Sequence, residues 1–233
     1  MRNKLKSPDI KVVIPARNEE AAIAKVISEI KIAVSEIIVA DNGSTDKTAQ
    51  VARQMGATIV SVPQPGYGRA CLAGIAAAKP CDIIVFLDGD ASDFPEDMDQ
   101  IVNPIIDDGM DMVIGSRLLD TIEPGALTPQ QRFGNALACW LMARFWGGTF
   151  TDLGPFRAIR SDALAKLNMT APTFGWTVEM QVRALKQGLT YKEVPVRYRK
   201  RIGKSKISGT VSGVILAGVY ILGTIFRELF SGK

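Results

Sequence analysis

The sequence predicts an α/β fold, in which a mostly parallel sheet is flanked by helices. Its first half alternates short β-branched runs with helically spaced stretches, an order that favours parallel strands joined by right-handed crossovers. The run 83–87 is apolar throughout, as expected of a strand buried on both faces. Polar turns follow several strands at their carboxyl ends, where open α/β sheets bind ligands. The 233 residues fit one large domain.

The predicted elements begin with a strand that Pro15 is expected to end, because proline has no N–H for sheet pairing. Strands and helices then alternate over 10–14, 19–30, 36–40, 47–55, 58–62, 68–78, 82–87, 98–107 and 112–115. The second half is less regular, with predicted helices at 129–146, 162–167 and 177–187 and a strand at 191–196. Residues 151–157 are expected to form a turn.

The C-terminal segment is set apart as 207–233, after a main domain of residues 1–206. Residues 207–226 carry no charge, which is close to the roughly 20 residues needed to span a bilayer. The first third of that stretch, however, is rich in serine, glycine and threonine. We therefore expect an apolar helix that docks on the domain or lies at a membrane surface, in preference to a span.

Charge and composition limit the class of protein. The chain is 47% hydrophobic and 22% charged, which excludes a disordered chain and allows a large core. Its net charge is only +4, but residues 197–206 hold six basic residues in ten. This basic run suggests phosphate groups or an anionic membrane as a partner; a solvated loop is the alternative. Nucleic acid is disfavoured, because no recognition fold accompanies the run.

Histidine is absent, which excludes Ser-His-Asp and Cys-His catalysis. A general base would have to be a carboxylate, or the acceptor would have to arrive already ionised. The three cysteines have unrelated spacings that fit neither a disulfide framework nor a zinc site. With no recognisable signal peptide, a reducing cytoplasmic location is expected, at the cytoplasmic face of a membrane if the basic run binds lipid.

Asp88 and Asp90 are the strongest candidates for a functional site. They are spaced i, i+2 directly after the buried strand and are separated by Gly89. Paired buried carboxylates are costly unless a cation offsets them, and carboxylate oxygens suit Mg²⁺ or Mn²⁺. The same Asp-Gly-Asp sequence is also common in simple turns.

Further polar motifs follow other predicted strands, and each has a structural alternative. Asp41 can accept from a nucleoside, although the turn 41–46 can also simply cap a helix. The glycine-bracketed loop 65–70 can present backbone N–H groups to phosphate, as a weak motif. Arg117 can reach the same sheet edge and bind phosphate oxygens.

Two later motifs are more ambiguous. Asp152 and Arg157 lie in one turn, where they can contact a phosphate or only pair with each other. Glu179 is placed in the first turn of a helix, as a general base or as an ordinary helix-start acid.

Taken together, these motifs resemble the family 2 glycosyltransferases of GT-A fold. The motifs occur in the order VVIPARNEE, DNGSTD, GYGRA, LDGD, GSR, DLGPFR and GKSK over residues 10–209. The most similar subgroup is that of dolichyl-phosphate mannose synthases and polyprenyl-phosphate glucosyltransferases. Seven short motifs in register make a chance match improbable.

The resemblance implies a role for each matching position. Nucleoside contacts are implied for Pro15, Ala16, Glu19, Asp41 and Gly68, and metal binding with the diphosphate for Asp88 and Asp90. Arg117 and Arg157 match cations that bind an acceptor phosphate, and Arg201, Ser205 and Lys206 match a loop that closes over the diphosphate. Asp90, Arg117, Asp152 and Glu179 are accordingly the expected catalytic residues.

The expected activity is metal-dependent transfer of a hexose from a UDP- or GDP-sugar to a polyprenyl phosphate, with inversion. The sequence 153–157 departs from the Thr-Ser-Gly-Phe-Arg typical of the lipid-linked subgroup, which leaves the acceptor open. Transfer to a small phosphate ester such as 3-phosphoglycerate is one alternative. A nucleotidyltransferase and a non-enzymatic nucleotide-sugar sensor are alternatives from other classes.

Overall fold

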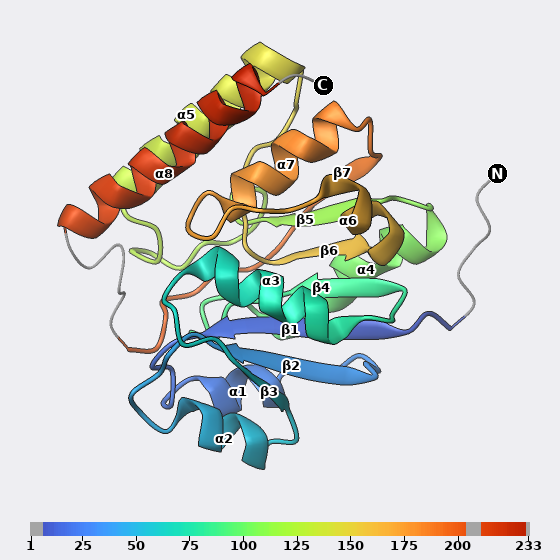
Figure 1. The fold of residues 1–233 in the computed structure, drawn as a ribbon, viewed down its shortest axis with the longest axis vertical. Coiled ribbons are helices and arrows are strands. Elements are labelled where there is room, and N and C mark those ends of the chain that lie inside the picture. The colour runs from blue at the N-terminus through green and yellow to red at the C-terminus, as the bar shows by residue number, and fades with distance from the viewer. Residues whose placement is uncertain (1–6, 204–210, 232–233) are drawn as a thin grey trace.

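The computed structural model describes residues 7–203 and 211–231, in which a seven-stranded sheet crosses the centre of the molecule (Figure 1). Its strand order is β3-β2-β1-β4-β6-β5-β7. All neighbours are parallel except β6, which is antiparallel to both β4 and β5, so the predicted mostly parallel sheet is confirmed. The strands are β1 Ile10–Ala16, β2 Glu36–Asp41, β3 Thr58–Ser61, β4 Ile83–Phe86, β5 Met112–Ser116, β6 Arg157–Arg160 and β7 Tyr191–Pro195.

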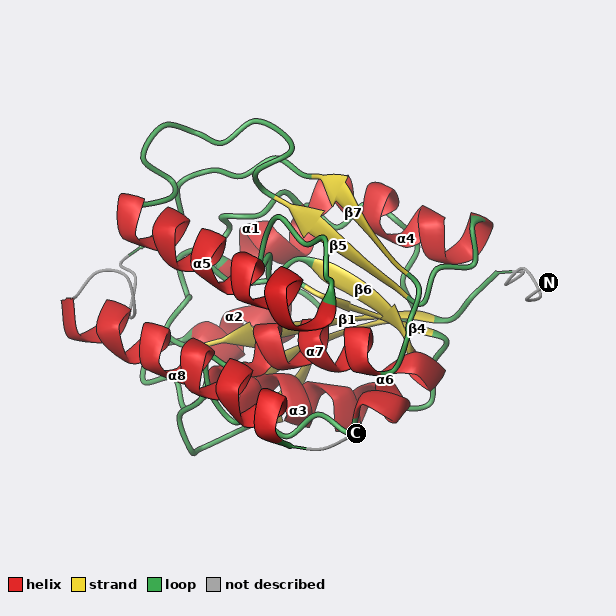
Figure 2. Ribbon diagram, turned by 90° about the horizontal axis from the view of Figure 1, so that it is seen from above, coloured by secondary structure: helices red, strands yellow, loops and turns green. Residues whose placement is uncertain are grey.

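Helices cover both faces of the sheet and create two cores (Figure 2). Side chains alternate across each strand, so in β1 Val13 joins one core and Val12 the other. Helices α3, α5, α6 and α7 pack over the first core, and α1, α2 and α4 over the second. The helices are α1 Ile23–Ser28, α2 Thr48–Gln54, α3 Tyr67–Ala78, α4 Met98–Asp107, α5 Pro129–Trp146, α6 Ser161–Leu167, α7 Trp176–Lys186 and α8 Val211–Phe230, with a short 3-10 turn η1 at Pro95–Asp97.

Helix α5 shows how local sequence sets an element's ends. Thr128 and Gln131 form a reciprocal capping box at its start, which satisfies backbone donors that the helix leaves open. Gly147 ends it in a left-handed conformation with φ of 71°, a geometry that glycine adopts without strain. The predicted bounds of α5 are therefore those observed.

Strand β6 was not predicted. Its four residues, Arg-Ala-Ile-Arg, are too short to give a periodic signal, and a turn was expected to run as far as Arg157. In the structure the strand enters between β4 and β5, with Ala158 paired to both Val85 and Val113. Tertiary pairing therefore creates an element that the local pattern does not specify.

Two boundaries at the start of the chain were wrong. β1 continues through Pro15, which pairs in register with Ala40. The pairing of β1 with β4 ends at Val13, so β4 does not require the N–H that Pro15 lacks. The helix expected from residue 19 begins only at Ile23, because Asn18 has a left-handed φ of 52° and a turn intervenes.

The C-terminal helix α8 packs beside α5 and α7 (Figures 1 and 2). The expected division between residues 206 and 207 falls in the range 204–210, outside the described residues. Within the described parts of the chain, no helix is long and apolar enough to cross a membrane.

Candidate active site

The carboxyl ends of β1, β2 and β4 meet at one edge of the sheet and line a cavity of about 320 Å³, here called the strand-end cavity. Its walls include Pro15, Ala16, Glu19, Asn42, Gly66, Tyr67, Asp88, Asp90, Thr173, Phe174, Arg201 and Tyr220. The fold therefore brings together six residues predicted for the site from distant positions: Pro15, Ala16, Glu19, Asp88, Asp90 and Arg201.

Asp88 and Asp90 lie two residues apart just beyond β4, as predicted. The Tyr67 hydroxyl donates to Oδ1 of Asp88 at 3.0 Å, and the Ser92 N–H donates to Oδ1 of Asp90 at 2.9 Å. Burial, together with the charge of Asp90, raises the pKa of Asp88 to about 7. Two carboxylates this close, with one carrying so high a pKa, form a site that a cation would stabilise.

Asp93 adds a third acidic group that the sequence reasoning did not single out. Its side chain is fully buried, and neither carboxylate oxygen finds a hydrogen-bond partner within the described residues. Burial and the nearby charges of Asp88 and Asp90 raise its pKa well above the usual value. The available signal was its position three residues after Asp90 in the same acidic run.

Arg201 is a cation that contacts this acidic cluster directly. Its guanidinium contacts Glu19 at 2.9 Å and Asp90 at 3.2 Å. Its Nε is buried without a hydrogen-bond partner within 7–203 and 211–231. This side chain therefore lies beside the carboxylates with a donor still available. Ser205 and Lys206, predicted for the same loop, are outside the described residues.

Arg117 extends the site toward a second cavity. It forms a bidentate ion pair with buried Asp152, with Nε–Oδ2 and Nη2–Oδ1 distances of 2.7 Å. Its guanidinium also stacks on the Tyr198 ring, 5.0 Å from the centroid. Burial alone would raise the pKa of Asp152, but the Arg117 charge and hydrogen bonds lower it below the usual value. Asp152 thus orients Arg117 and does not line either cavity.

Arg157 was expected to bind phosphate, and the structure places it elsewhere. Its side chain is fully buried, and it donates to the backbone carbonyls of Leu153, Gly154 and Thr177. Burial lowers its pKa to about 10. It lines neither cavity and does not pair with Asp152, so its contacts indicate a role in holding the turn that carries Asp152.

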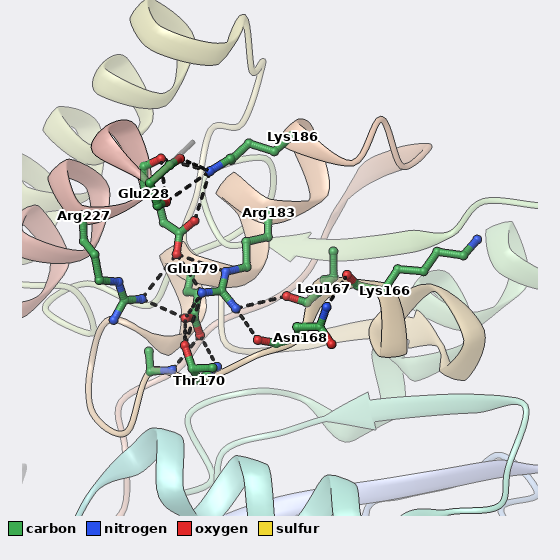
Figure 3. A network of polar contacts seen from close by, with 11 residues as sticks. Lys166, Leu167, Asn168, Thr170, Glu179, Arg183, Lys186, Arg227 and Glu228 are labelled. Carbon is green, nitrogen blue, oxygen red and sulfur yellow. Dashed lines mark hydrogen bonds and ion pairs between the residues drawn. The ribbon is translucent and has the colours of Figure 1, made fainter. Parts of the chain in front are cut away.

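Glu179 is likewise not brought into the site. Its fully buried carboxylate accepts from the backbone N–H groups of Thr170 and Ala171 at 3.0 and 2.8 Å, and pairs with Arg183 and Arg227 (Figure 3). A carboxylate with this many partners, outside both cavities, is poorly placed to accept a proton from a substrate.

Asp41 and Gly68 lie next to the strand-end cavity without lining it. Asn42, one residue after Asp41, takes the lining position and accepts from the Gly66 N–H at 2.7 Å. Gly68 permits close packing, because a Cβ there would lie 2.0 Å from the Ala171 carbonyl oxygen. That glycine is needed for the approach of α3 to the 171–172 backbone, a contact that no local motif indicates.

The second cavity, here called the α5–α8 cavity, has a volume of about 760 Å³. Most of its wall is apolar and comes from α5, α8 and the turn after residue 152, including Phe133, Leu137, Leu153, Pro155, Ala217, Ile221 and Leu222. It shares Tyr67, Asp88, Asp90, Phe174 and Arg201 with the strand-end cavity, and Arg117 and Tyr198 also line it. Of its four described charged lining residues, three are therefore shared with the strand-end cavity.

Comparison with known proteins gives consistent matches. The model of the family described as glycosyl transferase family 2 matches residues 11–168. An uncharacterized glycosyltransferase of Mycobacterium tuberculosis is 35% identical over 210 residues, covering 89% of this chain and 94% of the relative. A dolichyl-phosphate hexose transferase of Haloferax volcanii is 31% identical over 213 residues, covering 89% and 90%.

A solved structure extends the similarity over nearly the whole fold. The glucosyl-3-phosphoglycerate synthase of M. tuberculosis, crystallised with Mn²⁺, UDP and glucosyl-3-phosphoglycerate, superposes with a TM-score of 0.77. It is 25% identical, and the alignment covers 97% of this chain and 82% of the other.

Proposed function

This chain belongs to glycosyltransferase family 2, and we propose that it transfers a hexose from a nucleoside-diphosphate sugar to a polyprenyl phosphate. The observation that carries the proposal is the junction of the two cavities at Asp88 and Asp90. One cavity has the polar strand ends that suit a nucleotide, and the other has the apolar walls that suit a lipid chain. Family membership disfavours the nucleotidyltransferase and sensor alternatives.

The strand-end cavity is the proposed donor site. It is lined by Asn42 and by Gly66, whose N–H donates to Asn42, together with the carboxylate pair Asp88 and Asp90. A nucleoside placed toward Asn42 would direct its diphosphate toward Asp88, Asp90 and Arg201. UDP is the first nucleotide to test, because it is bound in the structurally similar synthase.

Mg²⁺ or Mn²⁺ fits the donor set, because Asp88 and Asp90 offer the oxygen ligands that these ions prefer. Among the described residues, no cluster of three or more acidic, histidine or cysteine side chains is arranged to hold a metal. The diphosphate would therefore complete the coordination, as is usual for Mg²⁺ at nucleotide sites. Bound there, the cation would offset the negative charge that develops on the leaving diphosphate.

The α5–α8 cavity is the proposed acceptor site. A polyprenyl chain would occupy the apolar walls from α5 and α8, and its phosphate would lie near Arg117. The ion pair with Asp152 and the stacking on Tyr198 hold that guanidinium in one orientation before the acceptor binds.

In the proposed reaction, an acceptor phosphate oxygen attacks the anomeric carbon of the donor sugar. The bond from that carbon to the diphosphate oxygen breaks, and the nucleoside diphosphate leaves with the electron pair. A phosphate is already ionised near neutral pH, so the step needs no strong base. This agrees with the absence of histidine from the chain and with the position of Glu179, whose carboxylate is bound by other residues outside both cavities.

Contact with a membrane surface belongs to the same proposal. Large apolar side chains are exposed on the helices that line the acceptor cavity: Phe133 and Trp140 on α5, and Val219 and Phe230 on α8. Phe133 is 71% exposed and Phe230 is 82% exposed, whereas most phenylalanines of soluble domains are largely buried. Such a surface suits the interface where a lipid-linked acceptor resides.

A small phosphate ester is the second candidate acceptor. The similarity to glucosyl-3-phosphoglycerate synthase over 97% of this chain favours it. The size and apolar lining of the α5–α8 cavity favour the lipid, because phosphoglycerate would leave much of the 760 Å³ unfilled.

An acceptor panel tests the proposal. UDP- and GDP-hexoses, with Mn²⁺ or Mg²⁺, would be offered to the protein with detergent-solubilised polyprenyl phosphate or with 3-phosphoglycerate. We expect metal-dependent release of the nucleoside diphosphate only with the polyprenyl phosphate. Turnover with 3-phosphoglycerate alone would contradict the lipid assignment and would support the second candidate.

A further inference from the structure

The segment 170–174 forms one wall of the strand-end cavity, to which it contributes Thr173 and Phe174. From one side α3 holds the segment, because the Arg69 N–H donates to the Pro172 carbonyl at 3.0 Å. From the other side Glu179 accepts from the N–H groups of Thr170 and Ala171. The cavity wall is therefore fixed by a residue that does not line the cavity.

Glu179 is shared between this wall and the C-terminal helix (Figure 3). Its Oε1 accepts from the Thr170 hydroxyl at 2.7 Å and from Arg227 of α8 at 2.8 Å. Arg183 contacts the same oxygen at 3.0 Å and also donates to Glu228 of α8 at 2.9 Å. A single buried carboxylate thus joins the cavity wall, α7 and α8.

The position of α8 also bears directly on both cavities. Tyr220 lines the strand-end cavity and packs edge-on against Phe174, with 6.2 Å between ring centroids. Gly175 touches α8 closely, because a Cβ there would lie 2.1 Å from the Thr224 hydroxyl oxygen. Between Tyr220 and Thr224, Ile221 and Leu222 line the α5–α8 cavity. A displacement of α8 would therefore reshape both sites.

We propose that Glu179 is a positioning residue that couples the seating of α8 to the shape of the donor site. Occupation of the strand-end cavity would then favour the docked α8, and docking of α8 would in turn raise nucleotide affinity, because such coupling is reciprocal. The identity of the ligand as a nucleotide rests on the proposed function, whereas the coupling between segment 170–174 and α8 does not.

Substitution of Arg227 should weaken the contact between Glu179 and α8 with little disturbance of the fold. The Arg227 side chain is 47% exposed, so Arg227→Gln should leave the protein folded. Arg144→Gln is the matched control, because Arg144 is an exposed arginine of α5 and lines neither cavity. Arg227→Lys keeps the charge and should restore part of the coupling, which loss of bulk packing alone would not allow.

Amide hydrogen exchange without ligand provides the first test. We expect the 170–174 amides to exchange faster in Arg227→Gln than in the unchanged protein, with Arg144→Gln unchanged and Arg227→Lys intermediate. Equal exchange of this segment in all four proteins would overturn the proposal, whatever the protein's activity.

Binding of UDP with Mn²⁺ provides the second test, with GDP as the alternative nucleotide. In the unchanged protein we expect protection to increase together at 170–174 and 218–230. Arg227→Gln should weaken nucleotide binding about fivefold, the lower range of typical coupling between sites. Full-strength binding with no added protection of α8 would overturn the coupling. Failure of both nucleotides to bind the unchanged protein would count against the proposed function, while the ligand-free exchange would still decide the coupling.

Discussion

Arg117, which lines the α5–α8 cavity, forms a bidentate ion pair with Asp152 behind the cavity wall. Asp152 accepts from both the side chain and the backbone N–H of Arg117, at 2.7 and 2.9 Å. The carboxylate is buried, and the stacking on Tyr198 leaves the arginine little freedom. A cation held in this way is preorganised for an anionic group.

Asp152→Asn should weaken both stability and acceptor use. Removing one charge of a buried pair is expected to lower the free energy of unfolding by about 3 kcal/mol. It should also raise KM for the acceptor more than KM for the donor, because Arg117 loses its orientation. Denaturant unfolding and steady-state kinetics measure the two effects. Asp162→Asn, at the exposed pair with Arg160, is the control and should change stability by less than about 1 kcal/mol.

Metal binding should depend on pH through Asp88, whose pKa in the metal-free protein is about 7. Because this pKa is raised above its unfolded value, the metal-free fold loses stability as pH rises toward 7. A cation requires the ionised form, so Mn²⁺ affinity should fall about tenfold for each pH unit below 7 and level off above it. Calorimetric titration with Mn²⁺ measures the profile. A flat profile between about pH 5.5 and about pH 7.5 would refute the assignment of Asp88 as a metal ligand.

Arg201→Gln should lower turnover strongly, because Arg201 lies beside Asp90 with an unused donor. Loss of one charge-stabilising donor typically costs roughly 100-fold to 1,000-fold in kcat. Lys200→Gln is the matched control in the same segment, since Lys200 is exposed and pairs only loosely with Glu123, at 3.9 Å. Similar kcat values for the two variants would argue against a role for Arg201 in the reaction.

Gly218→Phe should block the α5–α8 cavity. Gly218 lines the α5–α8 cavity, and a Cβ there meets no described atom within 4 Å, so the ring has space to enter. Transfer to a long polyprenyl phosphate should fall while UDP binding persists. Gly223→Phe places the same side chain on the same helix at an exposed position outside the cavity and should stay active. Equal activity of both variants would indicate that the lipid does not use this cavity.

Gly68→Ala should destabilise the fold, because its Cβ would lie 2.0 Å from the Ala171 carbonyl oxygen. We expect the free energy of unfolding to fall by about 2–4 kcal/mol. Gly134→Ala in α5 meets no described atom within 4 Å and should raise the free energy of unfolding by about 0.5–1 kcal/mol through helix propensity. Thermal or denaturant unfolding of the two variants distinguishes steric crowding at residue 68 from the general effect of adding a methyl group.

Parallel strands made part of the strand-end cavity predictable from sequence. Asp88 and Asp90 could be singled out from their position directly after a buried strand, at the sheet edge where parallel strands bind ligands. Pro15 and Glu19 were assigned only through the family resemblance. Arg201 was identified only through the family resemblance, since nothing in its local pattern shows that it reaches Glu19.

Residues outside the strand ends were harder to assign, because their roles depend on partners far away in sequence. Arg157 and Glu179 carry the charges expected of site residues, yet both are fully buried among structural contacts. Tyr67 and Tyr198 were missed because a lone tyrosine carries no positional signal.

The sequence alone establishes the alternating α/β order, the acidic pair after a buried strand and the absence of a histidine base. These follow from local periodicity and residue chemistry. Three features emerge only from tertiary packing: β6 enters the sheet antiparallel, Asp152 orients Arg117, and α8 closes an apolar cavity beside Asp88 and Asp90. Each of these depends on which distant surfaces pack together, and packing is a property of the whole chain that no short stretch encodes.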